Sequence, residues 1–264
     1  MFRQRLLLIA AASCAVALAL EGAIALAVPG SSSLDAHALH AFVVLSFNNH
    51  VLLVASRVDG ATPAVVVALT ALLAVLALRA GRRVLAVAIP LATLGAIGSA
   101  ELLKLLIDVP RISPALGFDQ VATSSWPSGH ATASMITLLC ALLVAPRERR
   151  RLVAVGGSAA VLLVCCSLLV LGAHYPSDIL GGLLLAGLWM SLTLLVVRRS
   201  ERVEARLALR EPVAGAVAGV VVALSGAAAV ASIGLPVGGA LLLATVTLGS
   251  VAAALSGGLI ATLG

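Results

Sequence analysis

Charged residues are scarce in this chain, which excludes an ordinary soluble domain. Asp, Glu, Lys and Arg together make up 11% of the 264 residues, 61% are hydrophobic, and the mean hydropathy is +1.17. A soluble domain usually carries about 25% charged residues. The apolar runs also lack the apolar and polar alternation that is typical of strands. The composition therefore indicates an integral membrane protein.

Paired cysteines and aromatic residues are lacking as well. The cysteines lie inside apolar runs, without the loop spacing of a disulfide or metal site, and we interpret them as small packing residues: Cys14, Cys140, Cys165 and Cys166. Aromatic residues make up 3% of the chain, so the net charge of +6 is not accompanied by an aromatic-interleaved basic surface. We therefore expect no nucleic acid among its partners.

Long apolar runs are what the chain has in abundance. A membrane-spanning helix needs about 20 apolar residues, and the backbone in lipid must bond to itself. Eight runs meet this need, at roughly 6–28, 61–79, 84–107, 129–145, 152–171, 178–197, 213–233 and 237–262. We predict an all-α integral membrane helical bundle of about eight transmembrane helices, in which the last two form a C-terminal hairpin.

Most basic residues lie in clusters between the predicted spans. Eight spans place 14 of the 17 Lys and Arg residues on one side of the membrane: Arg3, Arg5, Arg79, Arg82, Arg83, Arg147, Arg149, Arg150, Arg151, Arg198, Arg199, Arg202, Arg206 and Arg210. Such an excess is typical of the cytoplasmic side. We therefore expect a multi-pass protein of the cell membrane with both termini cytoplasmic. Arg57, Lys104 and Arg111 fall on the opposite, outer side.

The N-terminal run allows two interpretations. Arg3 and Arg5 before an apolar run, with Ala25-Leu26-Ala27 after it, resemble a signal peptide. The run from Leu6 to Val28 is longer than a usual signal core, so we favour an uncleaved first helix. The next segment, 31–49, has a partly apolar helical face and is expected to lie at the membrane interface.

Two polar segments stand at span ends on the outer side, Pro127–His130 and His174–Asp178. Ionisable groups at such positions are costly and are usually kept for function. Upstream, Lys104 and Arg111 are two helical turns apart and share one face near the end of the third span. Two cations, two histidines and an aspartate are groups with which a protein can hold a phosphate and attack it.

The cations and the start of the fourth span supply phosphate-binding groups. Arg111 offers a fork of donors to phosphate oxygens, and Lys104 offers a point charge. Ser128 and Gly129 place backbone N–H groups at a helix start, which favours anions. The alternative for Lys104 is an ion pair with Glu101 or Asp108.

The histidines and the aspartate supply the reacting groups. His174 is the candidate nucleophile, because a histidine can form a covalent phosphohistidine. Asp178 is the candidate carboxylate that orients the ring and stabilises its charged form. His130 is the candidate general acid for the leaving oxygen.

Together the three segments resemble the type-2 phosphatidic acid phosphatase family, integral-membrane lipid phosphatases related in core fold to vanadium haloperoxidases. The family pattern K-x6-R-P, P-S-G-H and S-R-x5-H-x3-D is matched by Lys104 and Arg111, by 127–130, and by Ser167, His174 and Asp178. The resemblance covers roughly 35–197 and implies a six-helix phosphatase core. It implies the same site residues, with His174, His130 and Asp178 catalytic and Lys104, Arg111, Ser128 and Gly129 holding phosphate. It also implies no metal and no other cofactor.

The chain departs from this pattern at two positions. Ile112 replaces the proline of the first part, for which we expect a small local effect. Leu168 replaces the arginine of the third part, which in the family binds phosphate. Arg57, at the head of the second span, is a candidate substitute cation, and the alternative is an interfacial residue paired with Asp59.

These observations support one function and leave two alternatives. We expect a metal-independent lipid phosphate phosphatase at the non-cytoplasmic face, with a polyprenyl phosphate or diphosphate favoured as substrate. The alternatives are a catalytically weakened lipid-phosphate binding or scaffold protein and a headgroup phosphotransferase. We divide the chain into a first transmembrane helix (1–34), a lipid-phosphatase core (35–200), and a basic linker with the C-terminal hairpin (201–264). The expected partners are the lipid substrate and the bilayer, with a homodimer through the small-residue hairpin as an alternative.

Overall fold

The computed structural model describes residues 2–28, 31–109, 116, 121 and 124–200. The described part is helical and contains no strand. In chain order its elements are α1 (Phe2–Ala27), α2 (Ser31–Val43), a 3-10 helix (Val44–Phe47), α3 (Asn49–Arg79), α4 (Arg83–Leu106), α5 (Gly129–Val144), a 3-10 helix (Arg147–Arg149), α6 (Arg150–Val170) and α7 (Pro176–Ser200). The predicted all-α membrane bundle is confirmed for these residues.

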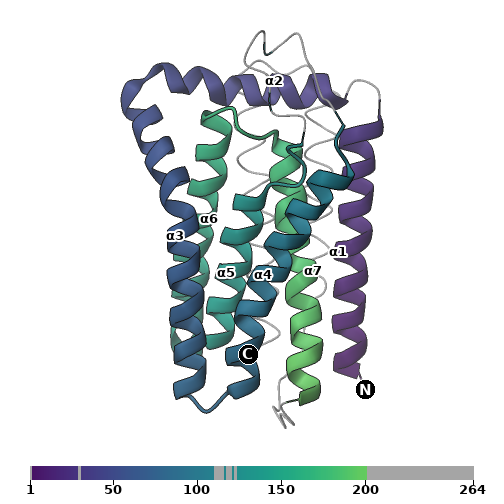
Figure 1. Cartoon of the computed structure of the whole chain (residues 1–264), viewed down its shortest axis with the longest axis vertical. Helices are drawn as coiled ribbons and strands as arrows, with labels where there is room; N and C mark the ends of the chain where they lie inside the picture. Colours follow the sequence, from purple (N-terminus) through teal and green to yellow (C-terminus); the bar gives the residue numbers. More distant parts are fainter. Residues whose placement is uncertain (1, 29–30, 110–115, 117–120, 122–123, 201–264) are drawn as a thin grey trace.

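In the described part of the chain, five helices are long and apolar enough to cross a membrane, namely α1, α3, α4, α6 and α7. Helix α5 has 16 residues and is shorter, about 24 Å at 1.5 Å per residue. Six of the eight predicted runs therefore form helices, and 213–233 and 237–262 lie outside the described residues. Helix α2, in the segment expected at the interface, crosses one end of the bundle almost at right angles to the other helices (Figure 1).

Helix α3 begins twelve residues before its predicted start. The side chain of Asn48 accepts hydrogen bonds from the backbone N–H groups of His50 (2.9 Å) and Val51 (3.4 Å), which caps the helix there. The prediction that the span begins near 61 was wrong, because this cap extends the helix through a polar stretch. Arg57 and Asp59 consequently lie inside α3 and not in a loop.

Helix α5 forms the centre of the bundle. Twelve of its residues are buried, and it packs against α3, α4, α6 and α7. Helix α1 packs along α7, so the segment 1–34 is in direct contact with the predicted core. Because α5 is short, its N-terminal end lies below the ends of its longer neighbours (Figure 1).

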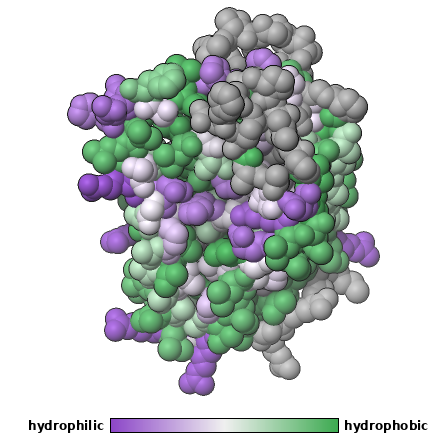
Figure 2. All heavy atoms as spheres, turned by 45° about the horizontal axis from the view of Figure 1, so that its top comes forward, coloured by the Kyte–Doolittle hydropathy of each residue, from purple (hydrophilic) through white to green (hydrophobic). Residues whose placement is uncertain are grey.

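The two ends of the bundle differ in charge. At the end opposite α2, the guanidinium of Arg82 donates to the Leu143 carbonyl at 2.8 Å, and that of Arg150 donates to the Ala145 carbonyl at 3.2 Å. Both bonds satisfy carbonyls that the C-terminus of α5 leaves open. Between the ends, hydrophobic side chains cover most of the flank visible in Figure 2. The arginine clusters and the polar motifs thus lie at opposite ends, as the predicted topology requires.

Two glycines of α4 give a test of the packing between α4 and α7. A Cβ added at Gly95 would lie 2.3 Å from the Cη2 atom of Trp189, whereas one added at Gly98 would meet nothing within 4 Å. We expect Gly95→Ala to lower the thermal unfolding temperature in detergent by several degrees, since overpacking typically costs about 1–3 kcal/mol. Gly98→Ala is the matched control and should leave it unchanged or slightly raised. Equal effects of the two substitutions would show that the Gly95 contact is not tight.

Candidate active site

A backbone contact joins the two motif-bearing helix starts. The N–H of Ser128 donates to the Asp178 carbonyl at 2.8 Å. Gly182 makes this approach feasible, because a Cβ there would lie 2.6 Å from the Ser128 carbonyl oxygen and 3.0 Å from Oγ1 of Thr132. The starts of α5 and α7 are thereby held side by side, which brings the second and third motifs together.

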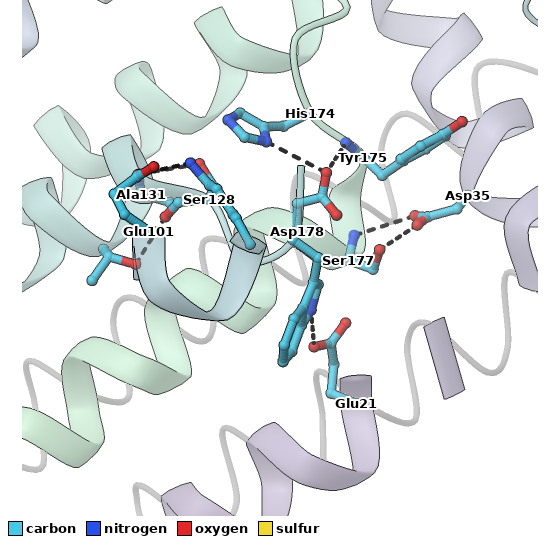
Figure 3. Close-up of polar contacts among 12 residues, drawn as sticks. Glu21, Asp35, Glu101, Ser128, Ala131, His174, Tyr175, Ser177 and Asp178 are labelled. Atoms are coloured by element: carbon cyan, nitrogen blue, oxygen red, sulfur yellow. Dashed lines mark hydrogen bonds and ion pairs between the residues drawn. The ribbon is translucent and has the colours of Figure 1, made fainter. Parts of the chain in front are cut away.

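His174 and Asp178 form a pair at the start of α7. Nδ1 of His174 lies 3.4 Å from Oδ2 of Asp178, and the same oxygen accepts the backbone N–H of Tyr175 at 2.9 Å (Figure 3). Asp178 is fully buried, and 12% of the His174 side chain is exposed. A buried carboxylate on Nδ1 leaves Nε2 of the ring as the nitrogen available for attack, so the geometry suits a nucleophilic histidine.

His130 lies in the first turn of α5, near charged groups of α3 and α4. Its Nε2 is 3.7 Å from Oδ1 of Asp59 on α3. It also interacts electrostatically with His174, Lys104 and Glu101. The structure therefore brings His130 near His174 and Lys104, and also near Asp59, which lies 71 positions earlier in the chain.

Lys104 lies over the glycine of the second motif. Its ammonium pairs with Oε1 of Glu101 at 2.8 Å, which is one of the two ion pairs considered from the sequence. A Cβ added at Gly129 would lie 2.6 Å from that Glu101 oxygen and 3.5 Å from the Lys104 ammonium. The absence of a side chain at Gly129 therefore leaves room for these charged groups at the start of α5.

Ser128 differs in part from its expected role. The side chain caps α5 by accepting the Ala131 N–H at 3.4 Å, and the residue is fully buried. Its own N–H is already bonded to the Asp178 carbonyl. In this structure the group joins the two helix starts, and the expectation that it binds phosphate stays a prediction. The helix start beside Gly129 remains the candidate anion site.

The arginine position of the third motif contributes no charge. Leu168 is 1% exposed and packs in the apolar core near the end of α6. The neighbouring Ser167 donates its hydroxyl to the Val164 carbonyl at 2.7 Å. The side chain here is therefore a packing residue, and any compensating cation must come from elsewhere.

Arg57 is the remaining sequence candidate among the described residues. Arg57 is exposed on α3. A residue two positions from Asp59 lies roughly 200° around the helix, and Asp59 is the one that approaches His130. The position of Arg57 therefore faces another side of α3 than that of Asp59, and in the described part of the chain no ion pair joins Arg57 to Asp59. Arg111 lies outside the described residues.

One buried and one half-buried contact that sequence reasoning missed support the motif loops. The indole N–H of Trp126, just before the second motif, donates to Oε2 of Glu21 on α1 at 2.8 Å, and Glu21 is 4% exposed. Asp35 on α2 accepts the backbone N–H of Ser177 at 3.2 Å and also its hydroxyl (Figure 3). An acidic residue inside an apolar helix was a signal for Glu21, since such residues are usually functional.

A metal site is not apparent in the described part of the chain. There, no three His, Cys, Asp or Glu side chains are arranged so that they could hold a metal ion. The expectation that the reaction needs neither a metal nor another cofactor stays a prediction.

Comparison with known proteins agrees with this arrangement. Residues 84–202 match the family model described as the PAP2 superfamily. No curated protein and no solved structure matched the chain. The matched residues run from α4 to just beyond α7 and include Lys104, both histidines and Asp178. Over residues 84–202 the chain is therefore similar to the PAP2 superfamily, which is consistent with a type-2 phosphatidic acid phosphatase family member and supports a phosphatase kind of function.

Proposed function

We propose that this protein is a metal-independent lipid phosphate phosphatase that works through a phosphohistidine on His174. The observation that carries the proposal is the meeting of three groups at the starts of α5 and α7. These are the His174–Asp178 pair, His130, and Lys104 beside Gly129. Together they supply a nucleophile, a proton donor and a phosphate-binding cation, which are what phosphoryl transfer to water needs.

The first step transfers the phosphoryl group to the enzyme. The lone pair on Nε2 of His174 attacks phosphorus, and an N–P bond forms as the P–O bond to the lipid breaks. The leaving oxygen takes a proton from the protonated His130. Asp178 accepts the Nδ1–H of His174 and thereby stabilises the positive charge on that ring.

The second step releases phosphate. Neutral His130 accepts a proton from water, whose oxygen attacks phosphorus while the P–N bond breaks. His174 is regenerated and inorganic phosphate leaves. Each histidine thus returns to its starting protonation state, and no metal or redox partner takes part in either step.

Lys104, Gly129 and Arg111 would hold the phosphate oxygens during both steps. Leu168 removes one charge-assisted contact that the family pattern supplies, which could cost about 2–4 kcal/mol of transition-state stabilisation. We therefore expect a slower enzyme than a relative with that arginine. A binding or scaffold protein is the alternative that Leu168 favours.

We propose that the site faces the non-cytoplasmic side and acts on a polyprenyl phosphate or diphosphate. The placement of the arginines at the opposite end of the bundle supports the orientation, because basic residues concentrate on the cytoplasmic side. The site at the end of a membrane bundle suits a substrate whose headgroup lies at the interface. The preference for a polyprenyl tail rests on the resemblance alone.

The central test is phosphate release by the detergent-purified protein. We expect metal-independent release from a polyprenyl diphosphate, a phosphatidylglycerol phosphate or phosphatidic acid in the presence of EDTA. His174→Ala should abolish it, since no other group in the proposed mechanism attacks phosphorus. No release from any of the three, with lipid binding retained, would favour the binding alternative. Transfer of phosphate to an added alcohol in preference to water would favour the phosphotransferase.

Glu101 gives a second test, because its carboxylate shares Lys104 with the phosphate. Glu101→Gln removes a negative charge beside the proposed anion site, so we expect KM for the lipid phosphate to fall roughly fivefold, equivalent to about 1 kcal/mol. Glu148→Gln, which removes the same charge from an exposed position at the opposite end, is the matched control. A rise in KM for Glu101→Gln would show that the carboxylate orients Lys104 and does not compete with substrate.

A further inference from the structure

Asp59 is the charged residue of α3 that reaches the site. Its Oδ1 lies 3.7 Å from Nε2 of His130, and each side chain is about one-third exposed, at 34% and 35%. This distance is longer than a hydrogen bond, so the contact is electrostatic in the structure without substrate. Contacts in an empty active site often tighten when substrate binds.

The other charged groups around His130 leave Asp59 as the carboxylate that can stabilise a positive charge on the ring. Burial is the largest influence on the His130 ring and lowers its pKa, and the Asp59 carboxylate is the next largest and raises it. His174, in the loop before α7, and Lys104 of α4 disfavour the protonated ring, whereas Glu101 of α4 favours it. Glu101 and Lys104 are paired with each other at 2.8 Å and largely offset one another. Among the described groups facing His130, Asp59 is thus the carboxylate left to balance a positive charge on the ring.

We propose that Asp59 is a positioning residue for His130, orienting the ring and stabilising its protonated form for the role of general acid. The inference rests on the proposed phosphatase function. A protonated imidazole has two N–H groups: one faces Asp59, and the other is left for the leaving oxygen. When the P–O bond breaks, that oxygen keeps the electron pair and takes the proton, while Asp59 remains ionised.

The site then contains two histidine–aspartate pairs with different tasks. Asp178 is fully buried and contacts His174, the proposed nucleophile. Asp59 is partly exposed and lies near His130, the proposed general acid. Asp59 lies outside the segment 84–202 that matches the superfamily, so the family match does not assign it. Only the packing of α3 against α5 brings it to the second motif.

Substrates with different leaving groups test the proposal. The alkoxide of a lipid phosphomonoester such as phosphatidic acid needs a proton as it leaves, whereas p-nitrophenolate leaves without one. Asp59→Asn should therefore lower kcat for the lipid phosphate several-fold on the alkaline side and leave kcat for p-nitrophenyl phosphate within about twofold. A loss of packing alone would lower both rates together, so equal losses, or no loss with either substrate, would overturn the proposal.

The pH profile gives a readout that a structural role would not move. His130 acts in its protonated form, so activity falls as pH rises through the titration of the ring. Removing the carboxylate removes a stabilising contact of the charged ring, and the alkaline limb for Asp59→Asn should move to lower pH by roughly 0.5 unit. Asp59→Glu keeps the charge, so its alkaline limb should lie closer to that of the unsubstituted protein, within about half of that shift. Glu148→Gln should leave the limb where it is in the unsubstituted protein.

A measurement that does not depend on turnover separates the proposal from the function on which it rests. NMR titration of the His130 ring in the full-length protein should show a lower midpoint for Asp59→Asn than for the unsubstituted chain. An unchanged midpoint in a folded variant would overturn the role of Asp59 even if His174-dependent phosphate release is found. A lowered midpoint in a protein that releases no phosphate would support the contact and overturn the phosphatase.

Discussion

The hydrogen bond from the Ser128 N–H to the Asp178 carbonyl is the contact on which the site depends. It fixes the start of α5 against the start of α7, and each start carries one histidine. In an apolar surrounding such a bond is hard to replace, because neither group has water as an alternative partner. Gly182 leaves room for it, and Glu21 and Asp35 support the adjoining residues Trp126 and Ser177 from α1 and α2.

Charge balance distinguishes this site from the family pattern. Leu168 replaces a cation with a buried apolar side chain, and Glu101 already neutralises much of the charge on Lys104. The described part of the site therefore carries less positive charge than the motifs alone suggest. With fewer cations in the site, a protonated His130 would contribute more to catalysis, since a charged ring both donates a proton and attracts phosphate. The proximity of Asp59 is consistent with such a site.

The first helix illustrates why a boundary drawn from motifs can miss structural dependence. The resemblance begins after 1–34, yet α1 packs along α7 and its buried Glu21 bonds the residue that precedes the second motif. The division at 34 remains a prediction about domains. The physical connection between α1 and the site is nevertheless direct, because the Trp126 ring also lies against Gly22 and Gly181.

Hydropathy and motif spacing by themselves determined the helical class, six helices of the described part, and the candidate residues Lys104, His130, His174 and Asp178. These properties are local or periodic, so they can be read along one chain. Only the tertiary structure decided that α3 starts at Asn49, that the Ser128 N–H is used internally, and that Asp59 faces His130 while the position of Arg57 faces another side of α3. Such contacts depend on the rotation and depth of separate helices, which packing sets and sequence spacing does not encode.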